Sequence, residues 1–124
     1  MQRACFRLHL RQDRIDAYRE RHAAVWPEML QALKQAGWDN YSLFIAPDGT
    51  LIGYVEASDS IDQAQARMAL TDVNTRWQEQ MGEFFTELDG ASPDEGFELL
   101  DEIFHLEDQL ASSAGDEPTS APAR

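Results

Sequence analysis

A histidine lies in the middle of an apolar stripe near the start of the chain, within the segment 18–27, YRERHAAVWP. If this region is helical, His22 shares one face with residues spaced three or four positions apart, namely Ile15, Tyr18, Val25 and Met29. An imidazole has an unperturbed pKa of about 6.5, so it can give and take a proton near neutral pH. His22 is therefore either a buried histidine with a satisfied hydrogen bond or a proton carrier that lines a pocket.

Acidic residues dominate the composition, and the formal net charge is −13. The excess lies in residues 39–124, which carry three basic and nineteen acidic residues, whereas residues 1–38 carry seven basic and four acidic ones. Such a surface repels phosphate backbones, so we expect no nucleic-acid partner. The chain has no run of about 18 apolar residues, which argues against a membrane span. The first residues are too polar for a signal peptide.

Cysteine and histidine are both scarce. The single cysteine, Cys5, excludes an internal disulfide framework and fits the reducing cytosol, so we expect a cytoplasmic protein. One cysteine and three scattered histidines do not form a zinc motif, so no metal site is expected.

The apolar pattern predicts the elements that must position His22. Residues 4–11 alternate as a strand with Phe6, Leu8 and Leu10 on one face. A helix follows to about residue 35, with Asp13 as its cap, a kink or break at Pro27, and Gly37 after its end. Residues 39–46 and 51–57 form a hairpin around the turn PDGT at 47–50.

The second half of the chain continues with helices and one more strand. Ser58, Asp59 or Ser60 can cap a helix over 61–69, and Asp72 can cap the next one. The inward stripe of that helix consists of Val73, Trp77, Met81 and Phe84 or Phe85. Residues 90–96, GASPDEG, are expected to form a loop, and residues 97–106 the last strand.

This order of elements predicts an α+β fold of the ferredoxin-like βαββαβ type, with a four-stranded antiparallel sheet and helices on one face. Both faces of several strands carry apolar residues, so the uncovered face predicts a homodimer with two sheets packed together. Residues 1–106 form the domain. Residues 107–124 have one leucine and no aromatic residue, and we expect an acidic, disordered tail.

Four segments resemble the L-rhamnose mutarotase family: YRERHAAVWPEM at 18–29, Asn40-Tyr41, TDVNTRW at 71–77 and EIFHL at 102–106. The resemblance runs from about Phe6 to Leu106. It implies a dimeric ferredoxin-like α/β barrel and a homodimeric isomerase that interconverts the α and β anomers of L-rhamnose or a related 6-deoxy sugar. Mutarotation opens and closes a hemiacetal without redox change, so no cofactor is expected.

The resemblance also assigns roles to single residues. It makes His22 the catalytic proton donor and Tyr18 and Tyr41 sugar-binding residues. Trp77 corresponds to the first of two adjacent tryptophans in the family site, and Gln78 replaces the second. An amide supplies hydrogen bonds where an indole would supply a stacking face, so Gln78 leaves the sugar specificity open.

Two other functions fit the same pattern. Dimeric α/β barrels also include monooxygenases, in which a helix histidine meets haem or a large aromatic substrate, and one fold hosts many chemistries. The chain could also be a non-catalytic sugar-binding dimer in which His22 is a core residue.

Overall fold

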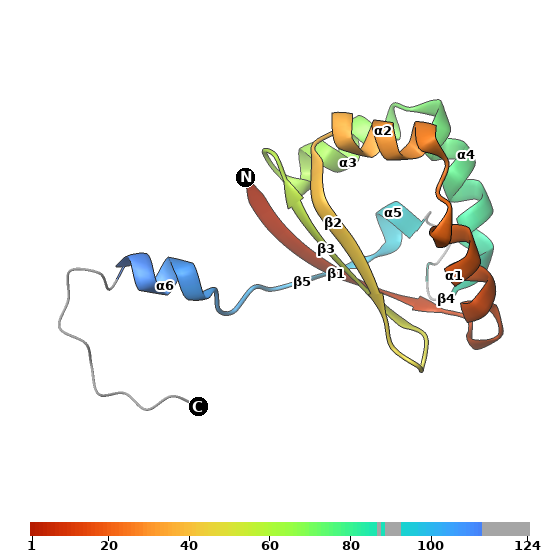
Figure 1. Ribbon diagram of the computed structural model, residues 1–124, viewed down its shortest axis with the longest axis horizontal. Coiled ribbons are helices and arrows are strands. Elements are labelled where there is room, and N and C mark those ends of the chain that lie inside the picture. The colour runs from red at the N-terminus through yellow and green to blue at the C-terminus, as the bar shows by residue number, and fades with distance from the viewer. Residues whose placement is uncertain (87, 89–92, 113–124) are drawn as a thin grey trace.

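The computed structural model describes residues 1–86, 88 and 93–112 and shows a curled antiparallel sheet with helices packed on one side (Figure 1). The central strand is β1 (Gln2–Leu10), which pairs along one edge with β3 (Thr50–Ala57). The outer neighbour of β3 is β2 (Trp38–Ile45). Within the described ranges, no helix is long and apolar enough to cross a membrane.

The other edge of β1 is shared by two short strands. β4 (Phe85–Thr86) pairs with His9 and Leu10, and β5 (Glu98–Leu100) pairs with residues 5–7. The sheet order is β2-β3-β1 followed by this shared position, with every pairing antiparallel. The predicted ferredoxin-like α+β arrangement is confirmed, although two segments take the place of its fourth strand.

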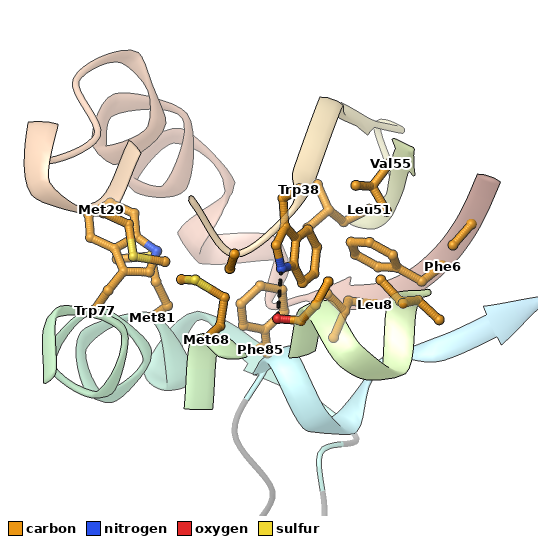
Figure 2. Close-up of a cluster of buried hydrophobic side chains, with 14 of the residues drawn as sticks. Phe6, Leu8, Met29, Trp38, Leu51, Val55, Met68, Trp77, Met81 and Phe85 are labelled. Carbon is orange, nitrogen blue, oxygen red and sulfur yellow. Dashed lines mark hydrogen bonds between the residues drawn. The ribbon is translucent and has the colours of Figure 1, made fainter. Parts of the chain in front are cut away.

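Four helices cover one face of the sheet (Figure 1): α1 (Ile15–Ala23), α2 (Pro27–Gln35), α3 (Ile61–Ala69) and α4 (Asp72–Met81). The predicted face of β1 is buried beneath them, with Phe6, Leu8 and Leu10 at most 7% exposed. Figure 2 shows Trp77 and Met81 of α4 and Met68 of α3 meeting this layer of apolar side chains. The core therefore lies between the sheet and the helices, and α1 and α4 are both fixed to it.

The break expected at Pro27 is present. α1 ends at Ala23, and Pro27 is the first residue of α2, a position at which its missing N–H costs no hydrogen bond. Gly37, with φ of +96°, follows α2 as expected. The prediction that Asp13 caps the helix is wrong, because Asp13 lies in the short 3-10 turn η1 (Gln12–Arg14) and the N-cap of α1 is Arg14.

The other predicted caps have mixed outcomes. Ser60 caps α3, since its hydroxyl accepts a hydrogen bond from the backbone N–H of Gln63 at 3.1 Å. Asp72 does not cap α4; the hydroxyl of Thr71 accepts from the N–H of Asn74 at 3.3 Å, which makes Asp72 the first helical residue. Both Phe84 and Phe85 are buried, one in the turn η2 (Gly82–Phe84) and the other in β4.

The C-terminal part differs most from expectation. The predicted strand over 97–106 is wrong beyond Leu100, because β5 pairs only with residues 5–7 of β1 and residues 101–105 form no strand. The segment 93–96, expected to be loop, is the short helix α5 (Pro93–Gly96); residues 90–92 lie outside the described residues. The helix α6 (Leu106–Ser112) includes the first residues of the predicted tail, and residues 113–124 are not described. Disorder of the tail stays a prediction.

The sheet face away from the helices carries a mixture of side chains. Ile52 and Tyr54 of β3 and Leu100 of β5 are half-buried there, and Phe44 of β2, opposite Ile52, is 61% exposed. Arg7 crosses the same face and pairs with Glu98 at 2.6 Å. The apolar residues at the centre of this face, together with their charged neighbours, are accessible to solvent in the single chain.

Candidate functional site

A cavity of about 340 Å³ lies between the first two helices, α4 and the sheet. His22 lines it from α1, Trp77 and Asn74 from α4, and Tyr41 from β2. The rest of its wall is mainly apolar and includes Met29 and Trp38. The cavity is thus aromatic and apolar with a few polar groups, which is the usual character of a small-molecule site.

Two further hollows meet at the same histidine. One, of about 60 Å³, lies deeper and is also lined by Tyr18 and Gln78. The other, of about 280 Å³, runs between α1 and the edge strand β2, where Arg19 and Phe44 contribute to its wall. His22 borders all three spaces, so its imidazole is neither directed only at solvent nor enclosed by packed side chains.

The protonation of His22 follows from its neighbours. Its Nδ1 lies 3.1 Å from the backbone carbonyl oxygen of Tyr18, one helical turn earlier. A carbonyl only accepts, so Nδ1 carries the proton and donates it, which leaves the Nε2 lone pair of the neutral ring for other contacts. Burial lowers the pKa of His22 below its ordinary value of 6.5, and the hydrogen bond to Tyr18 opposes this shift only in part. The ring is therefore a neutral base at pH 7.

Two aromatic rings hold the imidazole in place. The Tyr18 ring stacks on it with centroids 4.1 Å apart and planes inclined by 28°. Trp77 meets it edge to face, with centroids 5.5 Å apart and planes at 78°. Since α1 and α4 are separate helices, this packing fixes the position of His22 from both sides.

Tyr18 is 6% exposed, and burial, with a contribution from nearby Tyr41, raises its pKa well above 10. The phenol therefore keeps its proton. Within the described part of the chain, no hydrogen bond engages its hydroxyl group. A protonated tyrosine hydroxyl beside the deeper cavity is suited to bonding a ligand hydroxyl.

Tyr41 reaches the site because β2 is irregular there. The pairing of β2 with β3 shifts register between Asp39 and Ser42, and Asn40 has a φ of +48°. Such bulges redirect a side chain, here onto the face beneath the helices. Tyr41 packs against Trp38 with centroids 5.0 Å apart, and the Trp38 indole N–H donates to the carbonyl of Ala64 at 3.2 Å (Figure 2).

The structure thus brings together all five side chains singled out from the sequence: His22, Tyr18, Tyr41, Trp77 and Gln78. The sequence reasoning missed Asn74, which is 5% exposed and lines the larger cavity. A signal was available, because Asn74 lies three residues before Trp77 and is a polar residue on an apolar helical face. The same reasoning had identified His22.

Groups for a metal are not gathered at this site. Among residues 1–86, 88 and 93–112, no three His, Cys, Asp or Glu side chains are arranged to hold a metal ion. The chemistry available around His22 is proton transfer by the imidazole, together with hydrogen bonding by phenols and amides.

Comparison with known proteins gives a consistent result. A family model described as L-rhamnose mutarotase matches residues 3–106. L-rhamnose mutarotase of Burkholderia cenocepacia (strain HI2424) is 36% identical over 107 residues, which cover 86% of this chain and 100% of the relative. The protein of that name from Bacillus subtilis (strain 168) is 37% identical over 82 residues, 65% of this chain and 77% of the relative.

A solved structure agrees in fold. The crystal structure of an L-rhamnose mutarotase from Formosa agariphila superposes with a TM-score of 0.69 at 27% identity, covering 85% of this chain and 98% of that one. Within the described residues, the match to the family model spans all the strands except Gln2 of β1, covers the whole wall of the cavity of about 340 Å³ around His22, and ends where α6 begins. The chain belongs to the L-rhamnose mutarotase family.

Proposed function

We propose that this protein interconverts the α and β anomers of L-rhamnose, with His22 as the general acid and base. The observation that carries the proposal is the neutral imidazole, whose Nδ1 donates to the carbonyl oxygen of Tyr18 while the ring borders three hollows. The larger cavity, at about 340 Å³, is within the range of roughly 300–1,000 Å³ typical of small-ligand sites.

Mutarotation needs two proton transfers in each direction. Opening the pyranose removes the proton of the anomeric hydroxyl and delivers one to the ring oxygen, which gives the open-chain aldehyde. Rotation about the bond next to the aldehyde presents its other face, and closure reverses both transfers. Nε2 of His22 takes the anomeric proton and returns it on closure, a contribution worth roughly 10²- to 10⁴-fold in rate.

The second proton carrier is a tyrosine hydroxyl or water. The described residues that line the three hollows include no carboxylate. The high pKa of Tyr18 makes its hydroxyl a hydrogen-bond donor to the sugar and a poor base. Water in the hollow between α1 and β2 is then the simplest partner for the ring oxygen.

The neighbouring residues orient the sugar. Tyr18 and Tyr41 bond ring hydroxyls, and the face of Trp77 packs against C–H groups and the 6-methyl group. These contacts suit a deoxy sugar, which has one apolar end and several hydroxyls.

The working form proposed is a homodimer in the cytoplasm. The half-buried Ile52, Tyr54 and Leu100 on the open sheet face support a second copy packed sheet to sheet. The single cysteine supports a reducing compartment.

The experiment is saturation-transfer NMR on L-rhamnose at equilibrium, in which the α-anomer signal is saturated and transfer to the β-anomer is followed. We expect the purified protein to increase the exchange rate in proportion to its concentration, and D-glucose to show a smaller effect. Folded protein that leaves the exchange of L-rhamnose at its uncatalysed rate would contradict the proposal.

A further inference from the structure

Two amides on α4 form a hydrogen-bonded pair beside the catalytic histidine. Asn74 is 5% exposed and lines the larger cavity, and its Oδ1 accepts a hydrogen bond from Nε2 of Gln78 at 3.0 Å. Burying an amide is unfavourable unless it is hydrogen-bonded, and the bond from Gln78 satisfies the Oδ1 atom of Asn74. An apolar side chain at position 74 would not require such a bond.

Gln78 lies one helical turn further along and lines the deeper hollow together with His22, Tyr18 and Tyr41. Its amide is planar, so directing Nε2 toward Asn74 directs Oε1 to the other side of the group. Within the described ranges, Oε1 of Gln78 accepts no hydrogen bond. The site therefore contains an oriented acceptor within the group of residues around the imidazole.

We propose that Asn74 holds the Gln78 amide so that its Oε1 accepts a hydrogen bond from one ring hydroxyl of the sugar, which makes this pair the specificity-determining element of the site. Gln78 then binds substrate directly, and Asn74 is a positioning residue that acts through it. This inference rests on the proposed mutarotase function and adds the group that selects among hydroxylated sugars.

The chemistry of the pair predicts how it selects. A site that is built to hydrogen-bond a particular hydroxyl rejects an analogue that lacks it, because the buried polar group of the protein is then left unpaired. An indole at position 78 would instead pack against any apolar face of the sugar. Compared with a tryptophan at position 78, the amide of Gln78 loses non-specific stacking against the sugar and gains recognition of one hydroxyl group.

The test compares Gln78→Met, Asn74→Leu and the double variant with the unaltered protein. Each substitution keeps the approximate size of the side chain and removes its polar atoms. Gln80→Met is the matched control, since Gln80 is exposed on the same helix and its Oε1 accepts from Arg21 Nη1 at 2.8 Å, away from the cavities. The ligands are L-rhamnose and its 2-, 3- and 4-deoxy analogues. KM and kcat come from exchange NMR, and Kd comes from tryptophan fluorescence.

We expect Gln78→Met and Asn74→Leu each to raise KM and Kd for L-rhamnose about tenfold, with kcat changed by less than about threefold, as for the loss of one hydrogen bond. The KM and Kd of the double variant should be no higher than those of either single variant, because both substitutions remove the same hydrogen bond to the sugar. One deoxy analogue should bind the unaltered protein about tenfold more weakly than L-rhamnose, and this difference should vanish in Gln78→Met.

Unchanged KM in both single variants, or effects of the two substitutions that multiply, would overturn the inference. So would a fall in kcat that is equal for all four sugars and accompanied by a lower melting temperature, which is the result of a purely structural role. If the unaltered protein binds L-rhamnose without accelerating exchange, the proposed function fails, and the Kd values alone still decide whether Gln78 recognises a hydroxyl.

Discussion

The Nδ1 atom of His22 donates to the carbonyl oxygen of Tyr18, 3.1 Å away within the same helix, while the Tyr18 ring stacks on the imidazole at 4.1 Å. One residue thus fixes both the tautomer and the plane of the other. α1 ends only one residue after His22, at Ala23, and the break before Pro27 follows. Val25, within this break, lines the same cavity of about 340 Å³ as His22.

Replacing His22 with glutamine removes the imidazole that we propose as the proton carrier. The amide of His22→Gln can still donate to the Tyr18 carbonyl, but it has no basic nitrogen, so we expect catalysed anomer exchange to fall by about 10²-fold or more. The measurement is saturation-transfer NMR on L-rhamnose, with circular dichroism as a check of the fold.

The control is His9→Gln. His9 is also half-buried, but it lies on the opposite face of the sheet, where β1 pairs with Thr50 and Thr86. Exchange in this variant should equal that of the unaltered protein. Equal exchange rates in the His9 and His22 variants would exclude the imidazole of His22 from the mechanism.

The pH dependence of the rate should reflect the burial of His22. Its pKa lies below 6.5 because burial disfavours the charged ring, so the neutral form is still the major one at pH 6.5. We expect kcat/KM for L-rhamnose, which reports the protonation of the free enzyme, to fall to half its plateau only below pH 6.5. The shift of the His22 ring carbon signals in NMR should follow the same curve, and a kcat/KM that is already half-lost at pH 7 would contradict the assignment.

The same shift affects stability with a definite sign. Below pH 6.5 the unfolded chain protonates His22 before the folded one does, so the free energy of unfolding decreases as pH falls through this window. The decrease ends once pH is below the pKa of the folded state. In urea titrations this part of the pH dependence should be absent from His22→Gln.

Local chemistry made much of the fold readable from the sequence. The turn before β3 is an example, because Asp48 Oδ1 accepts from the N–H of Thr50 at 2.9 Å and Gly49 adopts a φ of +95°. The alternation of apolar residues in β1 and the apolar stripe of α4 likewise indicate which face of each element is buried. The apolar stripe that contains His22 indicated where the site lies.

The features that were missed depend on distant parts of the chain. Nothing within residues 97–106 shows that the pairing with β1 stops at Leu100, so the length of the last strand could not be read locally. That Asn74 lines the cavity depends on α4 facing α1 across it. Tyr41 was identified, but the bulge at Asn40 that directs it to the site is visible only in the register with β3.

Gly53 of β3 should be intolerant of alanine. A Cβ at this position would lie 2.2 Å from Cζ of Phe6, whose ring is 2% exposed and stacks on Phe97 at 4.3 Å. The added Cβ forces the Phe6 ring or the backbone of β3 to shift, so we expect Gly53→Ala to lower the free energy of unfolding by about 1–3 kcal/mol.

The matched substitution is Gly82→Ala, where an added Cβ has nothing within 4 Å. Since Gly82 follows α4 with helical dihedral angles, alanine there should leave the free energy of unfolding unchanged or slightly higher. Urea denaturation followed by fluorescence measures both. A Gly53→Ala protein as stable as Gly82→Ala would show that Phe6 is free to shift.

Ile52 tests the proposed dimer from the centre of the open sheet face. It lies directly opposite Arg7 on β1, which already pairs with Glu98, and in the single chain the carboxylate of Ile52→Glu would face solvent beside this pair. In a sheet-to-sheet dimer the same carboxylate would be removed from water, which is strongly unfavourable. Sedimentation velocity should therefore show a dimer for the unaltered protein and a monomer for Ile52→Glu.

The control is Leu70→Glu, which adds the same charge at a residue 88% exposed after α3 and should remain dimeric. An Ile52→Glu protein that sediments as a dimer would mean that the two copies do not pack through this face.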